Sequence, residues 1–77
     1  MTTLPCTFTL IDPDTNKARW YYINTATDLF GETVLIKRWG RIGRTGQEKL
    51  EWFESSTALK AEINTTIRRR LRNGYFV

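Results

Sequence analysis

The sequence predicts an α+β fold, an antiparallel sheet of four or five strands with one C-terminal helix packed on one face. Three observations predict it. Within residues 6–53, short segments alternate polar and apolar side chains, as strands with one buried face do. Turn-forming residues separate these segments, so strands that follow one another are expected to pair. After residue 54 apolar residues recur every fourth position, which is typical of an amphipathic helix.

The first strand is expected over residues 6–11, where Phe8 and Leu10 alternate with threonines. It ends at a turn over residues 12–16, because Pro13 fixes φ there and the Asp and Asn side chains can bond to their own backbone. This turn predicts a hairpin that leads into the next strand.

The second strand is expected over residues 19–25, which are rich in the aromatic and β-branched side chains that strands favour. Neighbours along a strand point to opposite faces, so Trp20 and Tyr22 lie on one side and Tyr21 on the other. We predict that Trp20 and Tyr22 face away from the helix. The aromatic residues expected in the core are Phe8, Tyr21, Phe53 and Tyr75.

The third strand is expected over residues 33–42, after a turn at 28–32, and the fourth over residues 47–53, after a turn at 43–46. Alternation divides the third strand into one face with Val34, Ile36, Gly40 and Ile42, and another with Leu35, Lys37, Trp39 and Arg41. We predict that the first set packs beneath the helix, with Arg38 as its exception. The second set would then point away from the helix.

A helix is expected to begin near residue 55, capped by Ser55 or Ser56, and to end at Gly74, which supplies a left-handed stop. Its apolar stripe is formed by Leu59, Ile63, Ile67 and Leu71. On a helical wheel Arg70 falls inside this stripe, so its side chain must reach over the sheet edge or find a partner. One helix covers one face of the sheet and is expected to leave the other uncovered.

The chain of 77 residues is expected to form one domain, residues 1–77, with a modest core. Twelve Lys and Arg against eight Asp and Glu give a net charge of +4 and a pI near 9.6, which fits binding to a polyanion. Residues 1–10 lack a basic segment and a long apolar stretch, and no run approaches the length of a membrane span. A cytoplasmic protein that does not contact membranes is expected.

The same composition argues against catalysis. Cys6 is the only cysteine and histidine is absent, so a disulfide within the chain, a thiolate metal cage and histidine-based catalysis lose their main ingredients. The acidic residues form no pair at a spacing typical of acid–base catalysis. We therefore expect a protein that is not an enzyme and that holds neither a metal nor a cofactor.

The third strand suggests a nucleic-acid site. Alternation places Trp39 between Lys37 and Arg41 on one face, with each cation about 6 to 7 Å away along the strand. A ring can pack on a sugar or base while flanking cations meet phosphates. The alternative is that Trp39 is a half-buried sheet residue and that the charges only keep the strand soluble.

Two basic clusters extend this hypothesis. Residues 37–44 and residues 68–72 each hold four basic residues and no acidic one. If the helix C-terminus lies near Arg44, the clusters merge into one patch that includes Arg70 and Arg72. The alternative is that cations in the last helical turn only complement the helix dipole.

The sequence around the third strand resembles the WGR domain family. The resemblance rests on Trp39-Gly40-Arg41 with its surroundings, on residues 16–23, on Asp28-Leu29-Phe30-Gly31 and on residues 72–75, and so covers nearly the whole chain. This family occurs beside the catalytic region of poly(ADP-ribose) polymerases, in bacterial regulators and as short free-standing bacterial proteins, the type to which this chain is most similar. The resemblance implies an antiparallel sheet with one helix packed on it.

The resemblance also implies a function. It assigns Trp39 to packing against sugar at a DNA end, and Arg41 to contacts with DNA or with other domains. Arg19 and Asn16 lie near further basic and amide positions of the family. The nucleic-acid-binding residues expected are therefore Asn16, Arg19, Lys37, Trp39, Arg41, Arg44, Arg70 and Arg72. DNA is favoured over RNA, with preference for strand ends or nicks.

A rival hypothesis is a protein-interaction module, such as a homodimer, that uses the uncovered sheet face. Tryptophan, tyrosine and arginine also dominate protein interfaces, so the composition of the strands fits this function as well. The sequence lacks a polymerase domain, so a DNA contact has no catalytic site in this chain to signal to.

Overall fold

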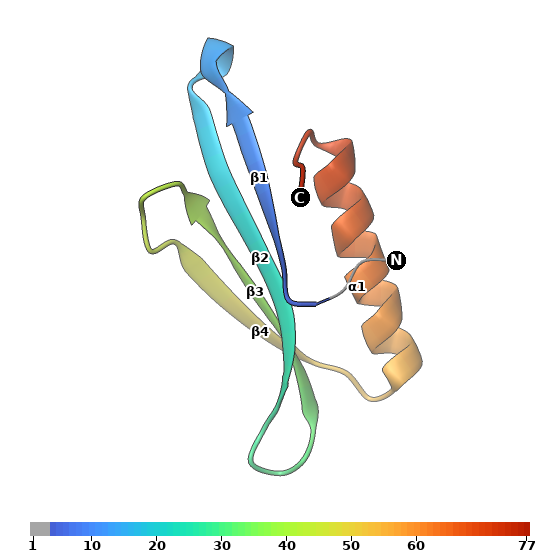
Figure 1. The fold of residues 1–77 in the computed structure, drawn as a ribbon. Coiled ribbons are helices and arrows are strands. Elements are labelled where there is room, and N and C mark those ends of the chain that lie inside the picture. Colours follow the sequence, from blue (N-terminus) through green and yellow to red (C-terminus); the bar gives the residue numbers. More distant parts are fainter. Residues whose placement is uncertain (1–3) are drawn as a thin grey trace.

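The computed structural model describes residues 4–77, which form a four-stranded antiparallel sheet and one helix, as the sequence predicts. The sheet order follows the chain: β1 (Cys6–Asp12), β2 (Lys17–Thr27), β3 (Thr33–Arg41) and β4 (Gln47–Trp52). A short 3₁₀ turn, η1 (Pro13–Thr15), joins β1 to β2, and α1 (Ser56–Arg72) follows β4. Figure 1 shows α1 lying along one face of the twisted sheet.

The possible fifth strand is reduced to a single bridge. After α1 the chain turns back, and Phe76 exchanges backbone hydrogen bonds with Thr9 at the outer edge of β1. This bridge ties the end of the helix to the sheet and covers part of the β1 edge, which would otherwise offer unpaired backbone groups to another strand.

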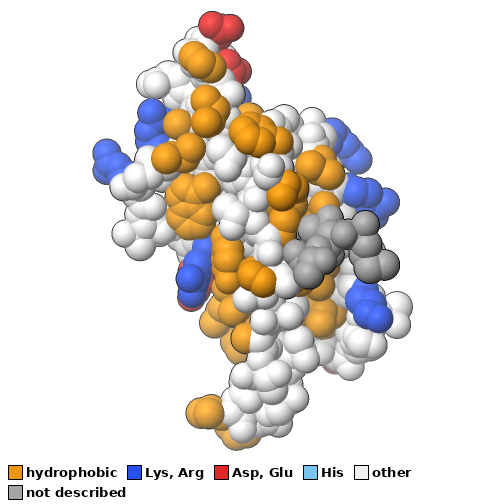
Figure 2. Space-filling view, in the orientation of Figure 1, with side chains coloured by type: hydrophobic (Ala, Val, Ile, Leu, Met, Phe, Trp, Pro, Cys, Tyr) orange, Lys and Arg blue, Asp and Glu red, His pale blue; other side chains and the backbone are white. Residues whose placement is uncertain are grey.

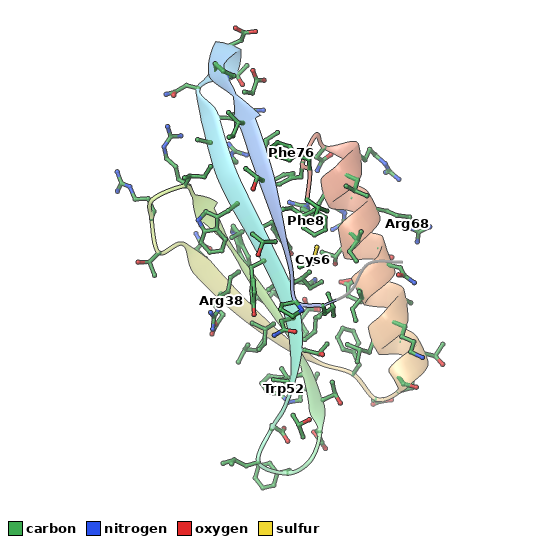
Figure 3. The ribbon with its side chains drawn as sticks, viewed as in Figure 1. Cys6, Phe8, Arg38, Trp52, Arg68 and Phe76 are labelled. Atoms are coloured by element: carbon green, nitrogen blue, oxygen red, sulfur yellow. The ribbon has the colours of Figure 1, made fainter. Side chains whose placement is uncertain are left out.

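The core lies between the sheet and α1. Its buried members are Cys6, Phe8, Tyr21, Ile23, Leu35 and Ile67. Partly buried residues packed against it include Phe53 and Tyr75, so all four aromatic residues expected in the core contribute to it. Figure 3 shows Cys6 and Phe8 pointing into this layer, while Arg68 leaves the outer side of α1. Trp20 and Tyr22 face away from the helix, as predicted, because they alternate with the buried Tyr21.

The predicted facing of β3 is wrong. Leu35 is fully buried beneath α1, and Lys37, Trp39 and Arg41 share its side of the sheet. The set expected beneath the helix, Val34, Ile36, Gly40 and Ile42, lies on the opposite face. Both sets contain apolar side chains, so the number of apolar residues in a set does not show which set faces the helix. Pairing with β2 decides it, because residues opposite each other in antiparallel strands share a face, and Tyr21 lies opposite Trp39.

The helix begins and ends at the residues that its sequence indicates. The Ser55 hydroxyl accepts a hydrogen bond from the Ala58 backbone N–H at 3.1 Å, which makes Ser55 the N-cap. Gly74 adopts a φ of +94° after the last turn. Leu71 departs from prediction because it is half exposed. A spacing of four residues turns the stripe by about 40° at each step, and three steps carry Leu71 off the sheet.

Two glycines allow the β3–β4 turn to fold tightly against β3. A Cβ on Gly40 would lie 2.7 Å from Gly46 Cα, and a Cβ on Gly46 would overlap the Trp39 carbonyl oxygen and lie 2.8 Å from the Trp20 ring. Gly46 also has a φ of +77°, where L side chains are strained. The indole N–H of Trp20 donates to the Arg41 carbonyl at 3.0 Å and holds its ring over this close approach.

The structure also bears on membrane-spanning segments and on metal sites. Within residues 4–77, the helix is too short and too polar to cross a membrane. The described residues also contain no group of three or more Cys, Asp or Glu side chains placed to hold a metal ion.

Candidate nucleic-acid interface

Trp39 lies half-buried on the helix side of the sheet, near the end of β3. Its ring stacks on Tyr21, with the centroids 6.1 Å apart and an angle of 17° between the planes. It also packs against the core from one side. The prediction that Trp39 points away from the helix is therefore wrong, but its other side borders an open groove.

This groove has a volume of about 650 Å³ and lies beside the last turn of α1. Aromatic and basic residues, together with Gly40, line it: Arg19, Trp20, Tyr21, Lys37, Trp39, Gly40, Arg41, Lys49, Arg70 and Tyr75. No acidic side chain is among these lining residues. The helix contributes Arg70 alone to the lining, so the groove remains open where α1 no longer covers β2 and β3.

Lys37 does not serve as a free cation in this groove. Its side chain is nearly buried, and its Nζ lies 2.7 Å from Glu51 Oε1 on β4 and 3.0 Å from Glu62 Oε2 on α1. The expectation that Lys37 faces solvent beside Trp39 is therefore wrong. A buried ammonium requires partners, and these two carboxylates tie β3, β4 and the helix together.

The Lys37 ion pairs give stability a specific pH dependence. Burial alone would lower the pKa of Lys37, but hydrogen bonds to Glu51 and Glu62 and the charges of Tyr21 and Glu51 outweigh it and raise this pKa above its ordinary value of 10.5. The stabilisation is therefore fully present below the unfolded-state pKa and is lost as the pH rises through the folded-state value. Urea unfolding between about pH 9 and about pH 11.5 should show a steeper loss of stability in the wild type than in Lys37→Met. Equal slopes in the two proteins would contradict this role.

Arg70 reaches from the helix onto the aromatic floor of the groove. Its guanidinium carbon lies 4.7 Å from the centroid of Tyr21 and 5.4 Å from that of Tyr75, within the range of cation–π contacts. The predicted position of Arg70 inside the apolar stripe is thus confirmed, and the two rings are its partners. Its Nε is buried and has no hydrogen-bond partner among the described residues, so one donor remains to be satisfied.

Arg41 and Asn16 form a pair at the mouth of the groove. Arg41 Nη1 donates to the Asn16 carbonyl at 3.2 Å, and Nη2 donates to Asn16 Oδ1 at 3.4 Å. Asn16 adopts a left-handed φ of 54° at the end of η1, which turns its carbonyl and amide toward β3. Arg19 lies opposite Arg41 across the β2–β3 ladder. The structure brings Arg19, Arg41 and Asn16 together, and Asn16 orients the Arg41 side chain.

The two basic clusters merge only in part. Arg70 joins the groove from the second cluster, whereas Arg44, in the exposed β3–β4 turn, and Arg72, at the exposed end of α1, are not among its lining residues. Sequence reasoning missed four lining residues, Trp20, Tyr21, Lys49 and Tyr75. Lys49 lies opposite Lys37 in the pairing of β3 with β4. The turn at residues 43–46 sets this register, and the register places Lys49 on the same face as Lys37.

Comparison with known proteins supports the family resemblance. The sequence profile of the WGR domain matches residues 4–76. An uncharacterized protein of Sinorhizobium fredii, y4dW, is 32% identical over 65 residues, which cover 84% of this chain and 32% of that protein. The chain thus spans about a third of the length of this curated relative. No solved structure matches the chain at a significant level. The chain belongs to the WGR domain family, which provides nucleic-acid-binding modules in poly(ADP-ribose) polymerases.

Proposed function

We propose that this chain is a non-catalytic DNA-binding module that prefers strand ends or nicks and binds them in the groove around Trp39. The single observation that carries the proposal is the lining of that groove, in which Trp39, Tyr21 and Tyr75 lie among cations with no acidic side chain. Aromatic faces stack on bases and sugars, and cations neutralise phosphates. A groove with both fits a nucleic-acid strand better than it fits a small neutral ligand.

The lining residues divide into two roles. Trp39 provides the face against which a sugar or base packs, because its other face is already supported by Tyr21. The phosphates are contacted by the cations that line the groove on the strands beside Trp39, namely Arg19, Arg41 and Lys49. Lys37 is a structural tie in this proposal, since two carboxylates already neutralise it.

The preference for ends follows from the aromatic face that Trp39 offers to a base or sugar. In a continuous duplex the bases are stacked on each other, and their faces are closed to a protein ring. A strand end or a nick leaves one such face and its sugar free to enter the groove, and it avoids the energy of unstacking, which amounts to a few kcal/mol. With few phosphate contacts, a dissociation constant of roughly 10⁻⁴ to 10⁻⁶ M at physiological salt is expected.

Replacement of Lys49 by glutamine tests the cationic part of the site. Lys49→Gln should weaken binding to a nicked duplex and should reduce the slope of log affinity against log salt by about 0.9, the share of one neutralised phosphate. Lys60→Gln is the matched control, because Lys60 is an exposed lysine of α1 outside the groove and its loss changes the net charge equally. Fluorescence anisotropy at several salt concentrations measures both quantities.

The outcome that contradicts the proposal is an equal salt slope for both variants, since the protein would then bind without contacting this groove. Blunt, nicked and single-stranded DNA and a matched RNA, titrated under the same conditions, test the finer preferences. The proposal expects the nicked duplex and the open end to bind most tightly. Equal affinity for an uninterrupted circular duplex would remove the end preference.

A further inference from the structure

The sheet face opposite α1 is mostly apolar and has no helix over it, although Thr7, Thr9 and Asn24 share it. Alternation and pairing place on it Ile11, Ala18, Trp20, Tyr22, Ala26, Val34, Ile36, Leu50 and Trp52, with Ile42 following at the end of β3. Four of these large side chains are about half exposed: Ile11 at 55%, Ile42 at 45%, Leu50 at 44% and Trp52 at 52%. Figure 2, which looks onto the β1 edge with α1 beside it, shows hydrophobic side chains at the surface of that side of the molecule as well. The exposed members form two groups, Ile11 and Ile42 near one end of the face and Leu50 and Trp52 near the other, with the Arg38–Glu48 row between them. Exposed apolar groups on an uncovered sheet face are typical of an interaction site.

The charge of this face is zero. Among the described residues of the four strands, the charged side chains that alternate onto it are Arg38 and Glu48, which lie opposite each other on β3 and β4. Arg38 Nε donates to Glu48 Oε2, and the guanidinium carbon stands 5.7 Å from the Tyr22 ring centroid. Figure 3 shows Arg38 on the side of the sheet remote from α1. The pair thus neutralises itself on a chain whose net charge is +4.

We propose that this face binds a second copy of the chain, so that two sheets pack face to face in a homodimer. The charges favour this occupant. A nucleic acid requires uncompensated cations, which this face lacks, whereas a second copy presents the same neutral apolar surface and adds no like-charge repulsion. Two-fold packing needs a surface that is complementary to itself, and stacked sheets with apolar inner faces meet this requirement.

The size of the face sets the strength of the dimer. Four strands about 4.8 Å apart and on average about eight residues long span about 19 Å by about 27 Å. Two copies would bury about 1,000 Å² between them, at the lower limit of specific interfaces. An interface at this limit resembles weak, transient contacts, so monomer and dimer are expected to exchange at working concentrations.

The dimer has a consequence for nucleic-acid binding that rests on the function proposed above. The groove around Trp39 lies on the helix side of the sheet, opposite the dimer face. Face-to-face packing therefore turns the two grooves outward in opposite directions. One dimer would hold two separate nucleic-acid molecules, and pairing would not strengthen the grip on a single short duplex.

Sedimentation of the purified protein without nucleic acid tests the dimer. Between about 1 µM and about 500 µM the weight-average mass should rise from the 9.0 kDa of the monomer toward twice that value. Leu50→Glu should hold the protein at the monomer mass over this range, because it would place two carboxylates within an apolar interface. Leu71→Glu is the matched control, since Leu71 is 50% exposed but lies on α1, and it should dimerise like the wild type. A monomer mass for the wild type at every concentration, or a dimer that survives Leu50→Glu, overturns the proposal.

A capture experiment tests the outward-facing grooves. A nicked duplex is fixed to beads, and retention of a second, fluorescent nicked duplex is measured with saturating protein. The wild type should retain it, whereas Leu50→Glu should retain at most about a tenth as much while binding a single duplex with unchanged affinity. Equal retention by both proteins overturns the two-sided arrangement. If neither protein binds a duplex at all, the proposed function fails, and the sedimentation result alone decides the dimer.

Discussion

Replacement of Trp39 by alanine is expected to weaken binding to a nicked duplex by about 1–3 kcal/mol, the usual range for an aromatic ring stacked on a base. This loss corresponds to a factor of about 5 to 150 in the dissociation constant. The indole presents one face to the groove and is held by Tyr21 on the other, so its removal takes away the flat surface that the strand would contact. Fluorescence anisotropy at one salt concentration measures the change.

Two further variants separate binding from folding. Trp39→Phe keeps a ring above Tyr21 and should recover most of the affinity. Trp52→Ala removes a tryptophan that is 52% exposed on the opposite face and should leave binding unchanged at concentrations below dimerisation. Because Trp39 also packs against the core, circular dichroism must confirm that each variant is folded at the assay temperature. Full affinity in Trp39→Ala would remove this ring from the site.

Replacement of Gly46 by alanine is expected to reduce the free energy of unfolding by about 2–5 kcal/mol. A left-handed φ costs an L residue about 1–2 kcal/mol, and overpacking against a rigid neighbour adds about 1–3 kcal/mol. The neighbours here are the Trp39 carbonyl and the Trp20 ring, and backbone cannot move aside as a flexible side chain can. A domain of this length has a total stability of only about 4–12 kcal/mol, so a large part of it would be lost.

Gly43→Ala is the matched control for this prediction. Gly43 lies in the same β3–β4 turn with a φ of +90°, but an added Cβ would meet nothing within 4 Å. Thermal or urea unfolding measures the stability lost by each variant. Both variants share the strain of a left-handed φ, whereas only Gly46→Ala adds the overlap of the new Cβ with Trp39 and Trp20. If both variants lose the same stability, the close approach of the turn to Trp20 does not constrain residue 46.

The order of the elements and most of their boundaries could be predicted because they depend on local signals. Alternation gave the strands, Ser55 and Gly74 marked the ends of the helix, and the helical wheel placed Arg70 inside the apolar stripe. Each of these signals acts within a few residues of the chain. The alternation of Trp20 with Tyr21 likewise identified which of them faces the core.

The facing of β3 could not be read in the same way, because it depends on register between strands. A shift by one residue turns every side chain to the other face. The prediction that Tyr21 faces the helix is correct. Because Trp39 pairs with Tyr21, knowledge of this pairing would have placed Trp39 on the helix side as well. The turn at residues 28–32 sets that pairing. Asp28 accepts hydrogen bonds from the backbone of Phe30 and Glu32, a geometry that its composition alone does not specify.

The site was recognised in part for the same reason. Residues close together on β3, such as Trp39 and Arg41, were found from spacing, whereas Lys49 and Tyr75 reach the groove through strand pairing and the chain after α1. Lys37 shows the converse error. Its neighbours along the strand suggest an exposed cation, but Glu51 and Glu62 from other elements neutralise it. The charge of a side chain predicts a role only when its partners are known.

The most direct test of the central claim, that nucleic acid enters the groove on the helix side of the sheet, is an NMR titration of the three tryptophan indole N–H signals with a nicked duplex. Trp39 lines the groove, Trp52 lies on the opposite face with its N–H bonded to Asp28, and Trp20 borders both sides. The Trp39 signal should shift as the duplex is added, while the Trp52 signal stays in place. A shift of Trp52 with Trp39 unmoved would contradict the account.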